Sequence, residues 1–154
     1  MWDMGVTELT GMDIVVKIEL INNNCMPIKK HEYDAGYDLK ATEGITLMFH
    51  EEYLFDTGVR FAIPPGYCGM VFPRSGLGNK GAVLKNTVGI IDSDYRGNIF
   101  VNVKNVDERP LTISKFERFA QIVIVPVLLA KLKVVDKLPL TDRGVGGFGS
   151  TGAE

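Results

Sequence analysis

The sequence lacks several features that would assign it to a common functional class. It has only two cysteines, Cys25 and Cys68, with no CxxC spacing and no pair of histidines nearby. A zinc site is therefore disfavoured, and a reduced compartment is expected: the cytoplasm, or the nucleus or host cell if the protein is viral. No apolar run reaches the roughly 20 residues that cross a bilayer, and the N-terminus does not resemble a signal peptide.

The chain also lacks an excess of positive charge. Its formal net charge is −2, and its lysines and arginines are scattered. Nucleic-acid and membrane surfaces usually require a basic face, so neither partner is expected. A triphosphate ligand stays compatible, because a few converging cations suffice to bind it. The 154 residues and the 45% hydrophobic fraction suit one soluble domain with a packed core.

Helical periodicity is scarce, and most segments have the pattern of β-strands. Residues 14–20 and 99–104 carry an apolar side chain at every second position, a period of two. Residues 59–63 and 67–72 flank Pro64-Pro65-Gly66, a pattern typical of a tight turn between two paired strands. These segments predict a sheet with short connections.

The longest apolar run, residues 119–129, is rich in β-branched residues and contains Pro126. Proline disfavours a helix there, so we expect a strand at an edge, at a bend or crossing between sheets. The one helical element expected is a turn or two around residues 75–80, which two glycines weaken. Many short strands separated by glycine and proline predict an all-β barrel or sandwich.

Two segments carry groups that suit a phosphate ligand. In AGYDL (residues 35–39), Asp38 could anchor a loop or reach a metal-bound water, and the structural role is the more frequent one. In PRSG (residues 73–76), small residues let the backbone approach a ligand, and Arg74 and Ser75 suit phosphate oxygens. An ordinary glycine-rich loop with a surface arginine fits equally well, and the P-loop spacing is absent.

The third segment, NTVGIIDSDYRG (residues 86–97), has two strand-like runs around a polar turn and predicts a hairpin. Asp92 follows an apolar run, which places a carboxylate beside a partly dry pocket, where it could accept a proton from water. The alternative is that Asp92 and Asp94 are ordinary turn residues. Tyr95 is equally compatible with a half-buried aromatic of the sheet.

Two more segments complete the set. RFAQ (residues 118–121) stands at the entry to the long apolar strand, where an arginine and a glutamine usually face solvent. The tail RGVGGFGSTG (residues 143–152) is too rich in glycine for a regular strand, and composition alone predicts a mobile terminus. Phe148 has no core to join among these glycines, which suggests that it stacks on an incoming ligand.

Together and in this order, the five segments closely resemble the five motifs of the trimeric dUTP pyrophosphatase (dUTPase) family. Residues 1–11 are interpreted from the sequence itself as a loose N-terminal extension. The resemblance implies a jelly-roll-like β-barrel (residues 12–142) and a flexible glycine-rich arm (residues 143–154) that closes as a lid. It also implies a homotrimer with sites at subunit contacts. The implied reaction is hydrolysis of dUTP to dUMP and pyrophosphate by water attack on the α-phosphate, with Mg²⁺ held by the phosphates and water. This activity keeps uracil out of DNA and supplies dUMP.

The resemblance also implies roles for single residues. Asp92 matches the carboxylate that orients and deprotonates the attacking water, and Asp38 matches an acidic residue near the phosphates and the metal. Tyr95 matches the aromatic that packs under the deoxyribose and leaves no room for a 2′-hydroxyl. The remaining matches are the uracil-reading edge (Asn86, Gly89, Ile91), the phosphate contacts (Arg74, Ser75, Gly76, Gln121) and the arm (Arg143, Phe148, Gly149, Ser150, Thr151).

Several points stay open in this interpretation. Arg118 either helps to neutralise the substrate or pairs with an acidic side chain. Phe116 and Glu117 replace the usual start of the fourth motif, and Asn98 stands where an acidic residue is common. A dCTP deaminase-like enzyme of the same fold is one alternative. A nucleotide-gated regulatory binding protein is the other.

Overall fold

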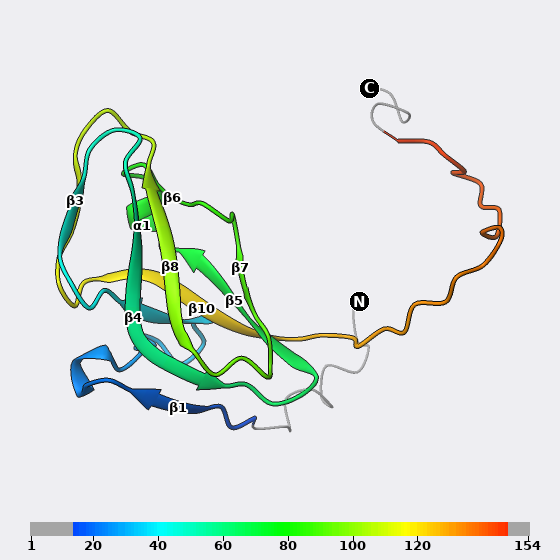
Figure 1. The fold of residues 1–154 in the computed structure, drawn as a ribbon, viewed down its shortest axis with the longest axis horizontal. Coiled ribbons are helices and arrows are strands. Elements are labelled where there is room, and N and C mark those ends of the chain that lie inside the picture. Colours follow the sequence, from blue (N-terminus) through cyan, green and yellow to red (C-terminus); the bar gives the residue numbers. More distant parts are fainter. Residues whose placement is uncertain (1–13, 148–154) are drawn as a thin grey trace.

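The computed structural model describes residues 14–147, which form an almost wholly β fold (Figure 1). Two four-stranded sheets have the orders β1-β4-β8-β6 and β2-β10-β5-β7, and β3 pairs with β9. The all-β expectation is confirmed, although the ladders formed by residues 14–147 do not close a barrel. No helix in that range is long and apolar enough to cross a membrane. The strands are β1 (Lys17–Leu20), β2 (Gly36–Lys40), β3 (Ile45–Leu47), β4 (Glu52–Ala62), β5 (Tyr67–Pro73), β6 (Ala82–Leu84), β7 (Gly89–Ile91), β8 (Asn98–Asn105), β9 (Leu111–Ile113) and β10 (Arg118–Pro126).

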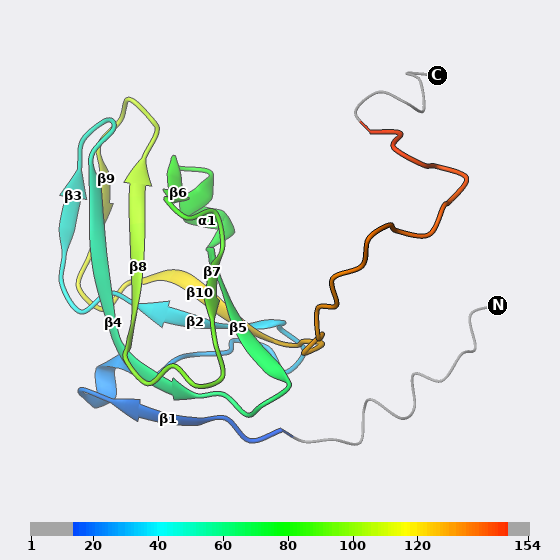
Figure 2. The ribbon, with the colours of Figure 1, turned by 45° about the vertical axis from the view of Figure 1, so that its right-hand side comes forward.

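The core lies between the inner faces of the two larger sheets (Figure 2). Ile99, Val101 and Val103 of β8 are all buried, as their period of two predicts. Phe55 of β4 meets Phe119 of β10 across the core, with ring centroids 5.1 Å apart. Both rings are fully buried, and burial of such a side chain contributes about 1.5–3 kcal/mol. This contact joins one sheet to the other.

Two turns connect different sheets, which corrects the expectation for both. The strands beside Pro64-Pro65-Gly66 are β4 and β5, which lie in separate sheets and are not paired. The turn itself forms, since Tyr67 N–H donates to the Pro64 carbonyl at 3.2 Å. Residues 86–97 are likewise not a hairpin, because β7 pairs with β5 whereas β8 pairs with β4 and β6. Local periodicity identifies strands but not the sheet that each one joins.

The long apolar strand also departs from expectation. β10 is not an edge strand: it pairs with β2 on one side and with β5 on the other. Pro126 is its last residue, and the following N–H, of Val127, donates to the Gly66 carbonyl at 2.8 Å. Proline therefore ends the strand rather than bending it. The expected helical turn is confirmed as α1 (Ser75–Gly78), and a 3-10 turn, η2 (Asn23–Cys25), precedes β2.

A bulge in β4 requires a glycine. The register between β4 and β8 shifts between Asp56 and Arg60, and Gly58 lies inside this irregularity with φ +66°. Its N–H donates to Asp56 Oδ1 at 2.7 Å, and its carbonyl accepts from Ile21 N–H at 3.0 Å. The bulge presses Gly58 against the buried Cys25, whose thiol pKa is raised by burial.

We expect Gly58→Ala to destabilise the fold more than Gly66→Ala does. A Cβ at Gly58 would lie 2.6 Å from Cys25 Sγ, whereas a Cβ at Gly66 (φ +87°) meets nothing within 4 Å among residues 14–147. Both variants carry backbone strain of about 1–2 kcal/mol. Only Gly58→Ala adds overpacking of about 1–3 kcal/mol. Urea unfolding at one protein concentration measures both, and equal midpoints would contradict the packing argument.

Candidate functional site

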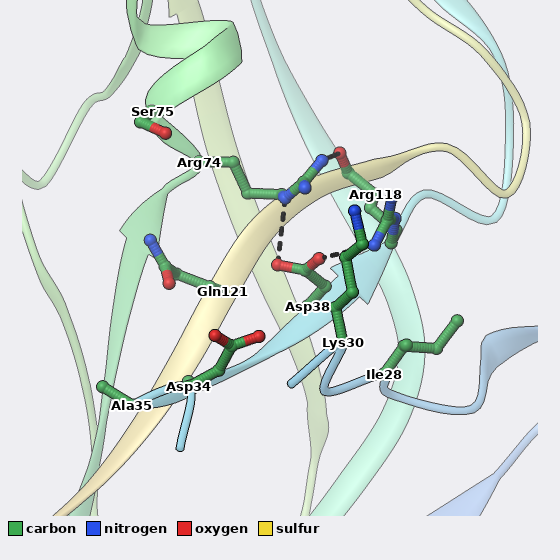
Figure 3. A pocket seen from close by; sticks show the side chains of 10 residues that line it. Ile28, Lys30, Asp34, Ala35, Asp38, Arg74, Ser75, Arg118 and Gln121 are labelled. Carbon is green, nitrogen blue, oxygen red and sulfur yellow. Dashed lines mark hydrogen bonds and ion pairs between the residues drawn. The ribbon is translucent and has the colours of Figure 1, made fainter. Parts of the chain in front are cut away.

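One carboxylate, that of Asp38 on β2, lies between two arginines (Figure 3). Its Oδ1 is 2.9 Å from Arg74 Nε, and its Oδ2 is 3.1 Å from Arg118 Nη1. Arg74 Nη1 also donates to the Arg118 carbonyl at 3.0 Å. The Asp38 side chain is only 16% exposed, so solvent screens these ion pairs less than it screens pairs on the open surface. Asp38 thus has a structural role, and Arg118 forms the ion pair with an acidic side chain that was one of its two alternatives.

The strand register explains why these residues meet. β10 is the strand between β2 and β5, and its Gln121 lies opposite Asp38 on one side and Phe72 on the other. Three segments that are far apart in the chain, residues 35–39, 73–76 and 118–121, are thereby brought side by side. The Gln121 side chain donates to the Pro73 carbonyl at 3.2 Å, which connects β10 to the start of the Arg74 loop.

A bulge in β10 turns Arg118 toward the same side as Gln121. Arg118 pairs with Lys40 and Ala120 with Leu39, so Phe119 is the extra residue. Phe119 and Ala120 are both buried, although strict alternation would place only one of two consecutive residues in the core. Without this irregularity, Arg118 would point inward. Bulges commonly re-aim a side chain in this way.

These side chains line a cavity of about 240 Å³. Two charged residues that the motifs did not identify, Lys30 and Asp34, also line it. Its walls thus carry three cations and two carboxylates, together with a hydroxyl and an amide, and this combination suits a polyanionic ligand. Ser75 and Gly76 lie exposed at the start of α1, beside Arg74. The lining residues are Ile28, Lys30, Asp34, Ala35, Gly36, Asp38, Arg74, Ser75, Arg118 and Gln121.

A second, smaller cavity of about 180 Å³ contains Asp92 and Tyr95. Asp92 is exposed and follows β7 directly, and its carbonyl accepts from Tyr95 N–H at 3.2 Å. The Tyr95 hydroxyl donates to the Asn98 carbonyl at 3.0 Å, and the ring lies so close to Gly97 that a Cβ there would collide with it. Apolar side chains form most of the remaining wall: Ile90, Ile91, Ile99 and Phe100.

Asn98 anchors the floor beneath Tyr95. Its Nδ2 donates to Asp56 Oδ2 at 2.9 Å, and its Oδ1 accepts from Arg60 Nε at 2.7 Å. An amide can serve both partners at once, because it carries a donor and an acceptor, whereas a carboxylate could only accept. The sequence alone did not reveal this function of Asn98. The position is therefore structural, as it holds the start of β8 in place.

The segment before β7 gives the second cavity a polar border. β7 is an edge strand of its sheet, so its outer edge has no partner strand among the described residues. Asn86 lies close to Gly89: its Nδ2 is 3.5 Å from the point that a Cβ on Gly89 would occupy. Backbone groups at a free strand edge can pair with the polar edge of a planar base. Asn86 is exposed, whereas Gly89 and Ile91 are half-buried.

Asp92 and Arg74 lie at opposite ends of the ladder that β5 and β7 form. β5 and β7 are antiparallel, with Ile91 opposite Gly69, while Arg74 follows the other end of β5. At about 3.3 Å per residue, Asp92 and Arg74 are roughly 20 Å apart along the strands. Within one chain, the Asp92 carboxylate therefore does not meet the arginines.

The chain after Pro126 runs away from the two larger sheets (Figure 1). Arg143 is exposed, and its Nε donates to the Gly146 carbonyl at 2.9 Å. It does not contact Asp38 or Arg74 in this arrangement. The expected arm residues Phe148, Gly149, Ser150 and Thr151 lie outside the described residues.

Carboxylates, histidines and thiols do not converge elsewhere. Residues 14–147 contain no group of three or more His, Cys, Asp or Glu side chains that could hold a metal ion. Cys25 and Cys68 are free thiols, and both are buried. Because burial raises the pKa of the Cys25 thiol, this group is a poor nucleophile.

Comparison with known proteins gives one family. The model of the dUTPase family matches residues 22–152. The deoxyuridine 5′-triphosphate nucleotidohydrolase of Chromobacterium violaceum is 43% identical over 148 residues, which cover 92% of this chain and 99% of that protein. The protein of the same name from Escherichia phage T5 is 40% identical and covers 91% of this chain and 100% of its own.

Solved structures agree with this result. The dUTPase of Staphylococcus bacteriophage 80alpha, solved with dUPNHPP, an analogue of dUTP, is 32% identical and has a TM-score of 0.79. It covers 90% of this chain and 98% of its own. A mutant of the dUTPase from phage phi11 of S. aureus, whose structure describes a structural Mg(II) ion, is 29% identical with a TM-score of 0.74. It covers 81% of this chain and 99% of its own.

Proposed function

The chain belongs to the dUTPase family, and on this basis we propose that it is a dUTP diphosphatase, which hydrolyses dUTP to dUMP and pyrophosphate. The observation that carries the proposal is the cavity around Asp38, where three family motifs place their polar side chains on one anion-binding surface. A metabolic enzyme with two free, buried thiols suits a reducing compartment, and we place it in the cytoplasm, or in the nucleus or host cell if the protein is viral.

The arginine pair would bind the phosphate chain. Each guanidinium has five N–H donors, and Asp38 occupies only one of them on each arginine. The unused donors of Arg74 and Arg118 are therefore already oriented when the substrate arrives. Preorganised donors stabilise developing negative charge without a cost of reorganisation during the reaction. Ser75, Gly76 and Gln121 border the same surface and supply neutral donors.

Mg²⁺ fits this site as an ion carried by the substrate. Hard oxygen ligands suit it, and the phosphates supply them. Both oxygens of Asp38 already accept from arginines, so this carboxylate suits a water-mediated contact to the ion better than direct ligation. When bound, Mg²⁺ would neutralise part of the phosphate charge.

A complete site would need a second copy of the chain. Asp92 and Arg74 are too far apart within one chain to act on the same phosphate group, but the first cavity of one copy can face the second cavity of another. Repetition of such a head-to-tail contact closes a ring, and we propose a homotrimer. Seven large apolar side chains between residues 127 and 142 support association, because all are exposed in the single chain: Leu128, Leu129, Leu132, Val134, Val135, Leu138 and Leu140.

In the assembled site, Asp92 would take a proton from water while the water oxygen bonds to the α-phosphorus. The bond from that phosphorus to its bridging oxygen breaks, and pyrophosphate leaves. Asn86 and the edge of β7 would read uracil, with Tyr95 beneath the sugar. The glycine-rich arm, with Arg143 and residues 148–151, would cover the site as a lid, which excludes water and strengthens the electrostatic contacts.

The alternative functions have less support. Neither the family model nor the relatives compared above is named as a dCTP deaminase. A nucleotide-gated binding protein without turnover would not need both a carboxylate and a preorganised arginine pair. Release of pyrophosphate from dUTP in the presence of Mg²⁺ tests the proposed activity directly. Absence of pyrophosphate, with intact dUTP binding, would favour the binding protein.

Asp92→Asn should abolish most turnover and leave dUTP binding intact. A positioned base contributes about 10²–10⁴-fold to rate, and asparagine keeps the shape but cannot accept the proton. Steady-state rates and calorimetric dUTP affinity give the two readouts. Asp94→Asn, two residues further along the same turn and outside the cavity, is the matched control and should keep its rate. Near-normal turnover by Asp92→Asn would remove this residue from the role of base.

Tyr95→Ala should narrow the preference for dUTP over UTP, because the ring would no longer exclude a 2′-hydroxyl. Loss of one such steric contact changes discrimination by about 10–200-fold. Tyr95→Phe loses the hydrogen bond to the Asn98 carbonyl but keeps the ring, so it should retain the preference. The ratio of kcat/KM for the two substrates decides the matter. An unchanged ratio in Tyr95→Ala would mean that the ring is not the gate.

Mixed subunits test whether sites are shared. Arg74→Ala and Asp92→Asn should each be inactive alone, since each damages one half of every site. Co-expression of the two chains should restore activity, because some subunit contacts then combine an intact Arg74 with an intact Asp92. A random mixture should contain about a quarter of intact sites. No recovery, with mixed oligomers verified by mass, would contradict a site that is shared between copies.

A further inference from the structure

One cation of the Asp38 cavity lies outside all five motifs. Lys30 belongs to the segment that connects η2 to β2, and its side chain lines the same cavity as Asp38 and Arg118 (Figure 3). It forms no ion pair with any carboxylate of residues 14–147. By contrast, both arginines of the cavity are paired to the same aspartate.

The backbone around Lys30 is fixed on both sides. On one side, Ile28 and Asp38 exchange two backbone hydrogen bonds, of 3.1 and 2.7 Å. On the other side, Asp34 N–H donates to the His31 carbonyl at 3.1 Å, and His31 N–H donates to Asp34 Oδ2 at 2.9 Å. Lys30 stands between these two anchors. Its position over the cavity is therefore built into the fold, while its side chain stays free to follow a ligand.

The two neighbouring lysines point to different sides. Lys29 places its Nζ 4.8 Å from the centre of the Tyr37 ring and borders a separate, mostly apolar groove. Lys30 lines the polar cavity with Ser75 and Gln121. Extended backbone alternates side chains in this way. Two residues of identical chemistry thus differ only in the side that they face.

Charge balance gives Lys30 its importance. Three cations and two carboxylates line the cavity, so the lining has a net positive charge only because Lys30 is present. Without it, Arg74 and Arg118 would be balanced by Asp34 and Asp38. A cavity with a neutral lining attracts a polyanion weakly, whereas a net cation concentrates the anion locally.

We propose that Lys30 binds the phosphate chain of the substrate and is the residue that makes this cavity selective for a polyphosphate. The identity of the nucleotide rests on the proposed function, but the affinity for polyphosphate does not. A flexible ammonium beside two fixed guanidinium groups supplies the contact that adapts to the ligand. Lys30 acts through substrate affinity, and it takes no part in the transfer of the proton.

The test compares Lys30→Ala with Lys30→Arg and with the matched control Lys29→Ala. Inorganic tripolyphosphate is titrated by calorimetry into each full-length variant, and kcat and KM for dUTP are measured in parallel. Lys30→Ala should weaken tripolyphosphate binding about 10-fold, the value of one charged hydrogen bond. It should raise KM by a similar factor with little change in kcat. Lys30→Arg should restore both values, and Lys29→Ala should match the unmodified protein.

Failure of this inference and failure of the proposed function give different results. Equal tripolyphosphate affinities for Lys30→Ala and Lys29→Ala overturn the role of Lys30, even if the protein hydrolyses dUTP. Affinity that depends on Lys30 in a protein without dUTP hydrolysis supports the inference and rejects the proposed function. Size-exclusion chromatography of each variant verifies that the assembly is unchanged. Rescue by arginine excludes a general loss of structure.

Discussion

The site depends on one carboxylate that holds two cations together. Arg74 and Arg118 both approach Asp38, and without a shared anion their guanidinium groups would repel each other in a partly desolvated cavity. Asp38 supplies the anion and a hydrogen-bond acceptor for each arginine. Because every strand that presents these groups belongs to the same sheet, the arrangement is as rigid as the sheet itself. The two guanidinium groups are therefore held in place before any ligand arrives.

Strand order makes this arrangement possible. β10 lies between β2 and β5, so three segments that are distant in sequence become neighbours across one strand. The bulge at Phe119 then lets that residue remain in the core while Arg118 turns to the cavity. The same bulge therefore determines both the packing of Phe119 in the core and the position of Arg118 in the cavity. A strictly regular strand that buries Ala120 could not also bury Phe119 and direct Arg118 to the cavity.

Sequence reasoning recovered the strands and the polar segments but not the connections between sheets. The alternation of Ile99, Val101 and Val103 predicted the buried face of β8, because burial acts on single side chains. The same logic wrongly paired the strands that flank Pro64-Pro65-Gly66, since the partner of a strand depends on contacts far away in the chain. The bulge at Phe119 left no local signal. Lys30 was missed because a lysine pair before a motif resembles an ordinary solvated surface.

The extended segment after Pro126 lets the C-terminal end of the chain reach distant positions without taking part in the packing of the sheets. Residues 127–147 contain no helix or strand, and twenty-one residues of extended chain span up to about 70 Å. That distance far exceeds the roughly 20 Å between Asp92 and Arg74 along the strands of one chain. The sheets can therefore keep a compact core while the end of the chain serves a distant location. A change in the length of residues 127–147 would alter the effective concentration of the C-terminus at its binding position. The packing of either sheet would stay the same.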